Sequence, residues 1–378
     1  MFGKLNRFKY FCSEVLSKVF VITKKQIGIL NTNTMKRLVI FAVALAVAVA
    51  CSPKEQNSYE YTAPEFKKTY KVDIVPLNND LIISNVVQLF QYEDKLIARA
   101  KNIDNKNVFQ VISLKDGTFL GSFGMVGRGD KELVRYYCTT QSFDGNKLYS
   151  IDNNAKTITF DLTRATEPNN ACAGYACSVG TKCRTTQLHS MPDGSLLHLG
   201  VPRIFLTDGS MLDTIQIYNN YPPVTEVIDA DEEIKQSYFR MQSNSTINPS
   251  RTKMAIATNY GMLLEIFDIA SNKIVLVANK YFYEPKMANI IAKEPDCVWG
   301  TAKIKSSDKY IYILYTDSFT YEDADWKLGV FDWRGSEVCC YTFDDLVSDF
   351  IVTPDDKRAY CWVQNADGEE YLGYFDLK

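Results

Sequence analysis

The cysteine at position 51 stands where a thiol could be chemically modified. It follows the apolar stretch Leu38 to Ala50, which begins directly after Met35, Lys36 and Arg37. A charged start, a short apolar core and small residues before a cysteine are typical of an export signal with a cleavage point. The apolar stretch is too short for a spanning helix, which needs about 20 residues. We therefore expect Cys51 to become the N-terminal residue of the exported chain and to carry a lipid.

The same signal divides the chain into parts. The tetrapeptide Ala48-Val49-Ala50-Cys51 resembles a bacterial lipobox, with Ala48 where leucine is more usual. Residues 1–34 lie upstream, are rich in Lys and Arg, and are interpreted as a start codon assigned too early or as a long n-region. Residues 35–50 are the predicted signal peptide, residues 51–66 a flexible tether, and residues 67–378 the folded domain.

Three further cysteines, Cys172, Cys177 and Cys183, lie close together in the sequence. An even number of cysteines follows Cys51, and in an exported protein this permits disulfides. A bridge within this region is therefore expected, with its connectivity left open. The alternative is a zinc site that also uses His189, but the spacing of the cysteines does not match the usual short knuckle. We predict no metal here.

A glycine-rich stretch, Gly127-Arg128-Gly129, could bind an anion together with the nearby Glu132. Backbone N–H groups of such a turn and a guanidinium can cradle a phosphate. A phosphate loop, however, follows a strand and opens a helix, and no helical pattern follows Glu132. We favour glycines that turn the chain with positive φ, and keep Arg128 and Glu132 as a candidate binding pair.

Composition and motifs give little support to catalysis. The sequence lacks a G-x-S-x-G nucleophile motif and has only 2 histidines, so an enzyme is the weaker interpretation. The formal net charge is −3, and the segment before Cys51 is basic, so the remainder is more acidic still. An acidic surface disfavours nucleic acid as a partner.

The folded part is predicted to be almost entirely β-strand, because short alternating runs rich in Tyr, Phe, Val and Ile lie between turn residues. The best helix candidate is the stretch Asp231–Arg240, with an excursion between blades as the equal alternative. The turns recur about every 50 residues, and four short strands per period of roughly 40–50 residues are typical of propeller blades. The six turn anchors are Asp94, Asp144, Asp193, Ser250, Asp308 and Asp355. They predict a six-bladed β-propeller rather than an open sandwich, whose strands are spaced about 8–12 residues apart.

The two ends of the folded domain fit this count. The chain stops after a third-strand pattern, Tyr371–Leu377, so the last blade lacks an outer strand. An alternating strand, Lys68–Leu77, has no blade of its own. We expect it to complete the last blade and so to cover a strand edge that would otherwise invite aggregation.

Two stretches of sequence resemble a known family. GSFGMVGRGDKEL (Gly121–Leu133) and the final repeats (Leu328–Leu377) are similar to TolB-like six-bladed propeller lipoproteins of Bacteroidetes, although Asp130 stands where that family usually has Pro. The resemblance covers essentially the whole chain after the signal. It implies the fold and an outer-membrane lipoprotein on the periplasmic or external face of the cell envelope, and it implies no catalytic residues.

Three functions agree with these observations. The first is a lipid-anchored binding or assembly module with an unknown ligand, because binding function concentrates on loops held by a rigid scaffold. The second, by analogy of fold, is a lactonase or other hydrolase with a metal such as calcium at the propeller axis. The third is a glycan-recognition lipoprotein that stacks sugars on aromatic rings, although such rings more often pack in sheets. The aromatic candidates are Tyr218, Tyr221, Trp299, Tyr315, Phe319, Tyr321 and Trp326. The expected partners are the membrane, through the lipid, and a protein or a glycan; no cofactor is expected except calcium in the hydrolase alternative.

Cys51→Ala is expected to abolish incorporation of labelled palmitate and to release the protein from the membrane fraction, because the thiol carries the acyl anchor. Ser52→Ala is the control and should keep both. Labelling that survives in Cys51→Ala would contradict the lipobox interpretation.

Overall fold

The computed structural model describes residues 60–78, 83, 85–100, 107–133, 137–152, 156–167, 171–176, 184–210, 213–221, 243–270, 273–286, 292–320 and 324–378. They belong to one compact unit that extends from Tyr59 to Lys378. Cys51 and the helix candidate Asp231–Arg240 lie outside the described residues. Within the described part, no helix has the length and apolar character needed to cross a bilayer.

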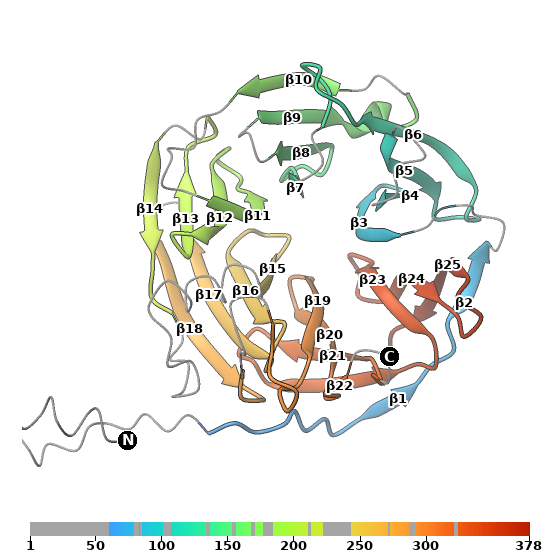
Figure 1. Cartoon of the computed structure of the whole chain (residues 1–378), viewed down its shortest axis with the longest axis vertical. Coiled ribbons are helices and arrows are strands. Elements are labelled where there is room, and N and C mark those ends of the chain that lie inside the picture. The colour runs from blue at the N-terminus through green and yellow to red at the C-terminus, as the bar shows by residue number, and fades with distance from the viewer. Residues whose placement is uncertain are drawn as a thin grey trace, which may run out of the picture. The chain divides into compact units, whose positions relative to one another are not determined.

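The described chain forms six β-sheets arranged in a ring (Figure 1), and this confirms the predicted all-β, six-bladed propeller. Blade one contains β3 (Val86–Tyr92), β4 (Lys95–Ala100), β5 (Asn107–Ser113) and β6 (Phe119–Met125). Blade two contains β7 (Tyr137–Gln141), β8 (Lys147–Asp152), β9 (Lys156–Asp161) and β10 (Ala171–Ala176), with a short 3₁₀ turn, η1 (Leu162–Arg164), after β9. Blade three contains β11 (Arg184–Ser190), β12 (Leu196–Val201), β13 (Ile204–Thr207) and β14 (Thr214–Tyr218).

The remaining three blades follow in the same order. Blade four contains β15 (Ser243–Ile247), β16 (Lys253–Thr258), β17 (Leu263–Ala270) and β18 (Lys273–Tyr281). Blade five contains β19 (Gly300–Ser306), β20 (Tyr310–Thr316), β21 (Lys327–Asp332) and β22 (Glu337–Thr342). Blade six contains β23 (Leu346–Val352), β24 (Arg358–Gln364) and β25 (Glu370–Asp376). In every blade the first strand lies nearest the axis, as Figure 1 shows.

The predicted turn anchors all lie between the first and second strands of a blade. In three of these turns an Asp side chain accepts a backbone N–H two residues further on, which is the hydrogen bond that makes Asp favourable there. Asp144 accepts from Asn146, Asp193 from Ser195, and Asp355 from Lys357. The sequence period therefore corresponds to one such turn per blade.

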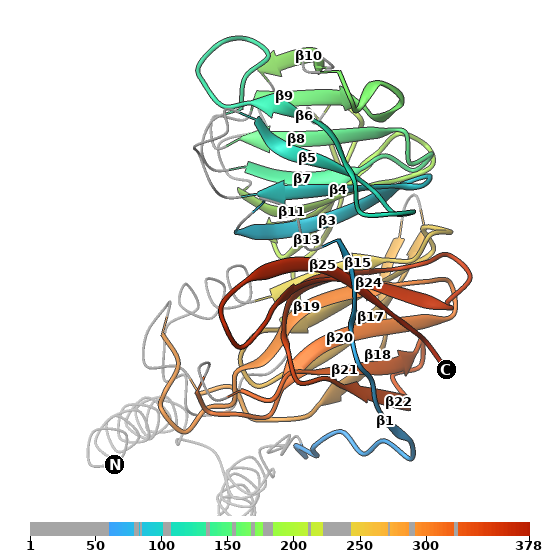
Figure 2. The ribbon, with the colours of Figure 1, turned by 90° about the vertical axis from the view of Figure 1, so that its right-hand side faces the viewer.

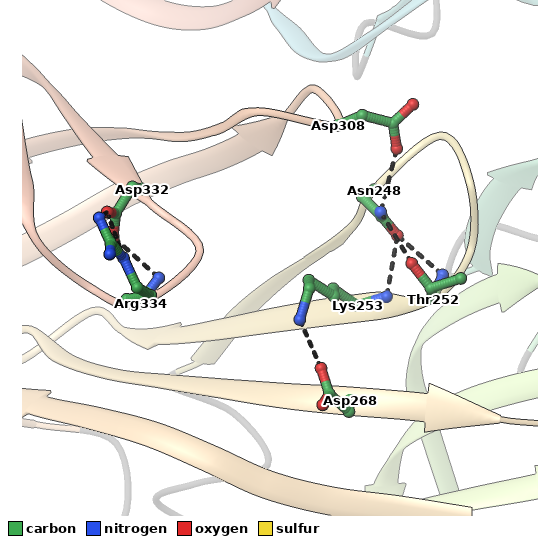
Figure 3. Close-up of polar contacts among 7 residues, drawn as sticks. All are labelled: Asn248, Thr252, Lys253, Asp268, Asp308, Asp332 and Arg334. Atoms are coloured by element: carbon green, nitrogen blue, oxygen red, sulfur yellow. Dashed lines mark hydrogen bonds and ion pairs between the residues drawn. The ribbon is translucent and has the colours of Figure 1, made fainter.

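In blade four, Asn248 and Asp308 extend this turn chemistry across a blade boundary (Figure 3). The Asn248 side chain accepts from the backbone N–H groups of Thr252 and Lys253, and donates to Asp308 of blade five at 3.0 Å. Ser250 also donates to Asp308, through both its backbone N–H and its hydroxyl. One carboxylate thus fixes the position of the neighbouring turn.

The two faces of the ring carry different connections. Successive antiparallel strands alternate in direction, so connections from first to second and from third to fourth strands leave on one face. Connections from second to third strands and from blade to blade leave on the other face (Figure 2 views the ring from the side). The first face, here the turn face, has tight turns such as that between β3 and β4. The second, here the loop face, has the longest connections, at residues 126–136, 219–242 and 282–299.

Neighbouring blades are held together by apolar side chains. Blades five and six share Leu328, Tyr341 and Phe350, among others, and blades one and two share three stacked or edge-on rings. Those rings are Phe109, Phe123 and Phe160, with centroids 4.9–5.4 Å apart. Because each blade is a separate hydrogen-bonded sheet, burial of these side chains supplies most of the adhesion between blades.

The N-terminal segment differs from the single strand expected over Lys68–Leu77. It forms two short strands along the outside of the ring (Figure 1). β1 (Thr69–Lys71) pairs parallel with β22 of blade five, and β2 (Val75–Asn78) pairs antiparallel with β25 of blade six. Ile74, between them, is buried with the core of blades five and six. Thus only the C-terminal part of the N-terminal segment, β2, adds a strand to the last blade.

The end of the expected tether also makes contacts. Thr62 donates its backbone N–H to Tyr281 O at 3.1 Å, and Tyr61 lies against the Tyr281 ring. The Phe66 ring packs edge-on against Phe331, with centroids 5.3 Å apart. The part of the tether from Tyr61 to Phe66 is therefore attached to blades four and five.

Two truncations test whether the N-terminal strands hold the ring closed. Deleting residues 52–66 removes the contacts of Tyr61 and Phe66, whereas deleting residues 52–78 also removes β1, Ile74 and β2. We expect the longer deletion to lower the free energy of unfolding further, by roughly 3 kcal/mol or more, since each large buried side chain contributes ~1.5–3 kcal/mol. Urea unfolding of both proteins measures the difference. Equal free energies of unfolding would contradict the idea that the N-terminal strands hold the ring closed.

The two histidines are largely shielded from water, and we therefore expect the folded protein to lose stability in acid. Burial lowers the pKa of both His189 and His198 to about 3, and Arg251 adds to the effect at His189. The unfolded chain, with histidine pKa near 6.5, then binds more protons than the folded chain between these values. Stability is therefore full above about pH 6.5 and falls toward pH 3, by up to about 1.4 kcal/mol per pH unit for each histidine. The free energy of unfolding, measured with urea at several pH values in this range, should fall less steeply with decreasing pH for His198→Gln than for the parent. An equal dependence on pH in the two proteins would contradict the role given to His198.

Candidate functional site

Four of the six inner strands carry a β-bulge at the same place. The register shifts lie between Val86 and Gln88 in β3, Thr185 and Gln187 in β11, Thr301 and Lys303 in β19, and Val347 and Asp349 in β23. A bulge inserts one residue and redirects the side chains beside it. The polar residue after each shift precedes a buried apolar one. The equivalent positions, here the axial residues, are Gln88, Gln187, Lys303 and Asp349.

Each axial residue bonds to the backbone of an inner strand in another blade. Such strands are sheet edges, and their axis-facing N–H and C=O groups need partners. The four bonds run from Gln88 Nε2 to Thr139 O (3.3 Å), from Gln187 Nε2 to Ser243 O, from Lys303 Nζ to Val87 O (2.7 Å), and from Leu89 N to Asp349 Oδ2 (2.7 Å). The axial residues thus link blades near the axis.

Charged side chains gather where blades five, six and one meet. Lys305, two residues after Lys303, donates to Leu89 O at 3.3 Å and lies 3.5 Å from Asp349 Oδ2. Arg99 on β4 pairs in register with Gln88. Burial lowers the pKa of Lys303; the charges of Lys305 and Arg99 lower it further, whereas Asp349 opposes the shift. We call these four residues the axial cluster: Arg99, Lys303, Lys305 and Asp349.

A second feature is a cavity of about 500 Å³ on the loop face, between blades five and six. Its residues come from the β20–β21, β22–β23 and β24–β25 connections and from the adjoining ends of β23 and β24. They are Ala324, Asp325, Trp326, Phe343, Asp344, Asp345, Leu346, Gln364, Asn365 and Ala366. Asp344 forms a surface ion pair with Lys71 at 3.0 Å, and Asp345 accepts a hydrogen bond from Tyr371 Oη at 2.7 Å. We call this cavity the loop-face pocket.

The glycine-rich loop holds its own carboxylate. Gly129 donates its N–H to Glu132 Oε2 at 2.7 Å, and a Cβ on Gly127 would lie 2.0 Å from the same oxygen. A side chain at Gly127 would push the flexible end of Glu132 aside, and Gly127 is not among the glycines with positive φ, whereas Gly124 is. Arg128 is exposed. The loop brings Gly127, Gly129 and Glu132 together.

The predicted disulfide region falls largely outside the described residues. Cys172 lies on β10, whereas Cys177 and Cys183 are not among those residues. Cys297, Cys339, Cys340 and Cys361, whose side chains the structure describes, are free thiols. As strand alternation predicts, Cys339 and Cys340 face opposite sides, one in the core of blades five and six and the other in that of blades four and five. Burial raises the pKa of Cys340 to about 11, so this thiol is a poor nucleophile.

The described histidines and Asn244 form hydrogen bonds to other side chains. His189 Nε2 bonds to Ser245 Oγ at 2.8 Å, and both His198 nitrogens bond to threonine hydroxyls at 2.9 Å. Asn244 on β15 donates to Asn259 Oδ1 at 2.6 Å. Within the described ranges, no three His, Cys, Asp or Glu side chains converge as metal ligands would.

The aromatic residues considered for glycan stacking serve different structural purposes. Tyr315 and Trp326 are buried, and Tyr218 contacts Phe267 edge-on. Phe319 is 54% exposed, and Tyr321 lies outside the described residues. Tyr221 and Trp299 pack against one small apolar cluster formed by Tyr260, Leu263 and Cys297, and Trp326 lines the loop-face pocket.

Sequence reasoning missed the axial cluster. The signal was present in β19, where Lys303 and Lys305 alternate with buried Ile304. A strand with one solvated face shows the same alternation. The positions of the bulges that align the axial residues cannot be recognised from an alternation of polar and apolar residues.

The comparisons with known proteins concern the fold. A family model described as TolB-like 6-blade propeller-like matches residues 65–355. No protein of curated function matches the chain. Among solved structures, the chain is similar to Kuenenia stuttgartiensis hydrazine synthase, with 12% identity, a TM-score of 0.45, and 75% of each chain covered. It is also similar to U3-55K, with 9% identity, a TM-score of 0.49, and 81% of this chain and 98% of that chain covered. A third similar structure is that of the RRP9 WD40 repeats, with 9% identity, a TM-score of 0.48, and 84% of this chain and 99% of that chain covered.

Likeness to solved structures at this level says nothing about a shared activity. The family model, by contrast, covers most of the chain, and its description agrees with the six sheets of the ring. The chain therefore belongs to the TolB-like six-bladed propeller family.

Proposed function

We propose that the protein is a lipid-anchored binding module of the cell envelope. The propeller fold suits a binding or assembly module, because a rigid ring presents loops without moving its core. The export signal and Cys51 support the anchor, and the resemblance to envelope lipoproteins supports an outer-membrane location. In this proposal the lipid holds the N-terminal end, and the ring carries the ligand.

The observation that carries the proposal is the loop-face pocket. It lies on the face with the longest connections, and its volume of about 500 Å³ falls within the range of small-molecule sites, ~300–1,000 Å³. The turn face, in contrast, is closed by short hydrogen-bonded turns such as that of Asn248. The loop face is therefore the side on which a ligand would dock.

The pocket favours a ligand rich in hydrogen-bond donors. Asp325, Asp344 and Asp345 present carboxylate oxygens, which only accept when ionised, and Gln364 and Asn365 add amide groups. The rings of Trp326 and Phe343 supply an apolar wall. Amines and sugar hydroxyls share the required donors, and aromatic rings attract both cations and the apolar faces of sugars.

A charge-matched pair of double variants tests this assignment. Asp325→Asn combined with Asp344→Asn removes two charges at the pocket and one surface ion pair, that with Lys71. Asp94→Asn combined with Asp130→Asn removes the same number of charges elsewhere, and also one surface ion pair, that with Lys95. Surface pairs of this kind contribute little to stability, so both proteins should fold.

Calorimetric titration of the parent with spermidine in one arm and with neutral oligosaccharides in the other identifies the ligand class. We expect binding in one arm that weakens about tenfold in the pocket variant and is unchanged in the control, as lost charge-assisted hydrogen bonds predict. Absence of binding in both arms, or equal weakening in the two variants, would exclude the pocket as the site.

A further inference from the structure

We propose that the loop-face pocket selects a small ligand with a primary ammonium group on an alkyl stem, and that Lys71 of β1 competes with this ligand for Asp344. This assignment rests on the proposed function, because it concerns the same pocket. It goes further in choosing the amine over the sugar and in giving the N-terminal strand a part in binding.

The charge at the pocket is of one sign. Three of the ten described residues that line it are aspartates, Asp325, Asp344 and Asp345, and none of the ten is Lys, Arg or His. Carboxylates gathered at a concave site attract cations and raise their local concentration. An ammonium gains from this attraction, whereas a neutral sugar does not.

The hydrogen-bonding groups of the pocket also favour an ammonium. Gln364 Nε2 donates to Gly368 O at 3.2 Å, and its amide nitrogen is thus engaged in the β24–β25 turn. Asn365 Nδ2 is engaged in the same turn, where it donates to Glu369 Oε2 at 3.0 Å. The ionised carboxylates of the pocket only accept hydrogen bonds. An ammonium has three donors and no acceptor, whereas each sugar hydroxyl also has an oxygen that calls for a donor.

One carboxylate of the pocket already holds an ammonium group. Lys71 Nζ lies 3.0 Å from Asp344 Oδ2, and the hydrogen bond to Asp344 raises the pKa of Lys71. The charged form of Lys71 is therefore the form that Asp344 favours. Because the Lys71 side chain is itself a primary ammonium on an alkyl stem, it marks the kind of group that fits beside this carboxylate.

The ion pair between Lys71 and Asp344 is weak enough for a ligand to displace. The two side chains are 67% and 78% exposed, and exposed pairs of this kind contribute little. Lys71 is not among the residues that line the cavity, whereas a ligand inside it also meets the rings of Trp326 and Phe343. Aromatic rings pack against alkyl stems and attract cations. The ligand thus gains contacts that add to those with Asp344.

Loss of this ion pair leaves β1 in place, because the strand is held by its backbone. Val72 donates its N–H to Thr342 O at 2.9 Å. Cys340 donates its N–H to Lys68 O, also at 2.9 Å. A variant that lacks the Lys71 ammonium should therefore fold as the parent does.

Calorimetric titration of the detergent-solubilised full chain tests the choice of ligand, with 5-aminopentan-1-ol in one arm and pentane-1,5-diol in the other, at constant ionic strength. The two compounds differ only in that an ammonium of the first is replaced by a hydroxyl in the second. We expect the amine to bind at least about tenfold more tightly, because the diol cannot form charge-assisted hydrogen bonds with the carboxylates. Equal affinities of the amine and the diol would overturn the proposal.

Lys71→Met tests the competition. Removal of the competing ammonium should tighten binding of 5-aminopentan-1-ol about two- to fivefold, which is the range that an exposed ion pair can supply. Lys68→Met, which removes an exposed lysine of the same segment, is the control and should bind as the parent does. Equal affinities of the two variants, or weaker binding in Lys71→Met, would show that Lys71 does not compete.

Failure of the amine and failure of the pocket give different results. Binding of neutral oligosaccharides without binding of the amine would overturn the choice of an ammonium and leave the pocket as a binding site. Amine binding that is unchanged when Asp325→Asn and Asp344→Asn are combined would place the amine elsewhere and overturn the proposal. Absence of binding to the amine, the diol and the oligosaccharides would overturn the proposed function together with this assignment.

Discussion

The structure depends on satisfying the inner edges of six separate sheets. A propeller has no continuous hydrogen-bonded ladder around its ring, so each innermost strand turns backbone groups toward the axis without a strand to pair with. Side chains from other blades supply the missing partners. Gln141 reaches Gln91 O from blade two, and Gln187 accepts from Ser245 N in blade four. These bonds are directional, and together with apolar burial they set how neighbouring blades are positioned.

This constraint also explains how two different environments arise in one ring. Where amides and hydroxyls satisfy the inner edges, the centre is neutral, and His189 joins it as an uncharged hydrogen-bonding group. Where lysines and an aspartate do so, the same geometry places charge in a region that is partly shielded from water. The loop face is free to differ from the turn face because its connections are not needed to hold the first two strands of each blade together.

The features that could be predicted from the sequence are those that repeat. One Asp- or Asn-containing turn per blade gives a period, and each such turn has a local cause in hydrogen bonds like that from Ser195 N to Asp193. The axial cluster could not be predicted, because its members lie far apart in the sequence and meet only when blade six is placed between blades five and one. Likewise, the pairing of Thr69–Lys71 with blade five depends on the outer surface of the closed ring, which the local pattern of that segment does not encode.

The attachment of the N-terminal segment has a mechanical consequence. A pull on the chain before Thr62 would first load the contact with Tyr281 in blade four, then the Phe66 ring, then β1 against β22, and finally β2 against β25. The load would thus pass through three blades in succession rather than peel one strand from one sheet. At the other end, Lys378 exchanges backbone hydrogen bonds with the Tyr341 hydroxyl, next to β1. Both ends of the propeller are therefore tethered to the same side of the ring, which would act as its strain-bearing sector.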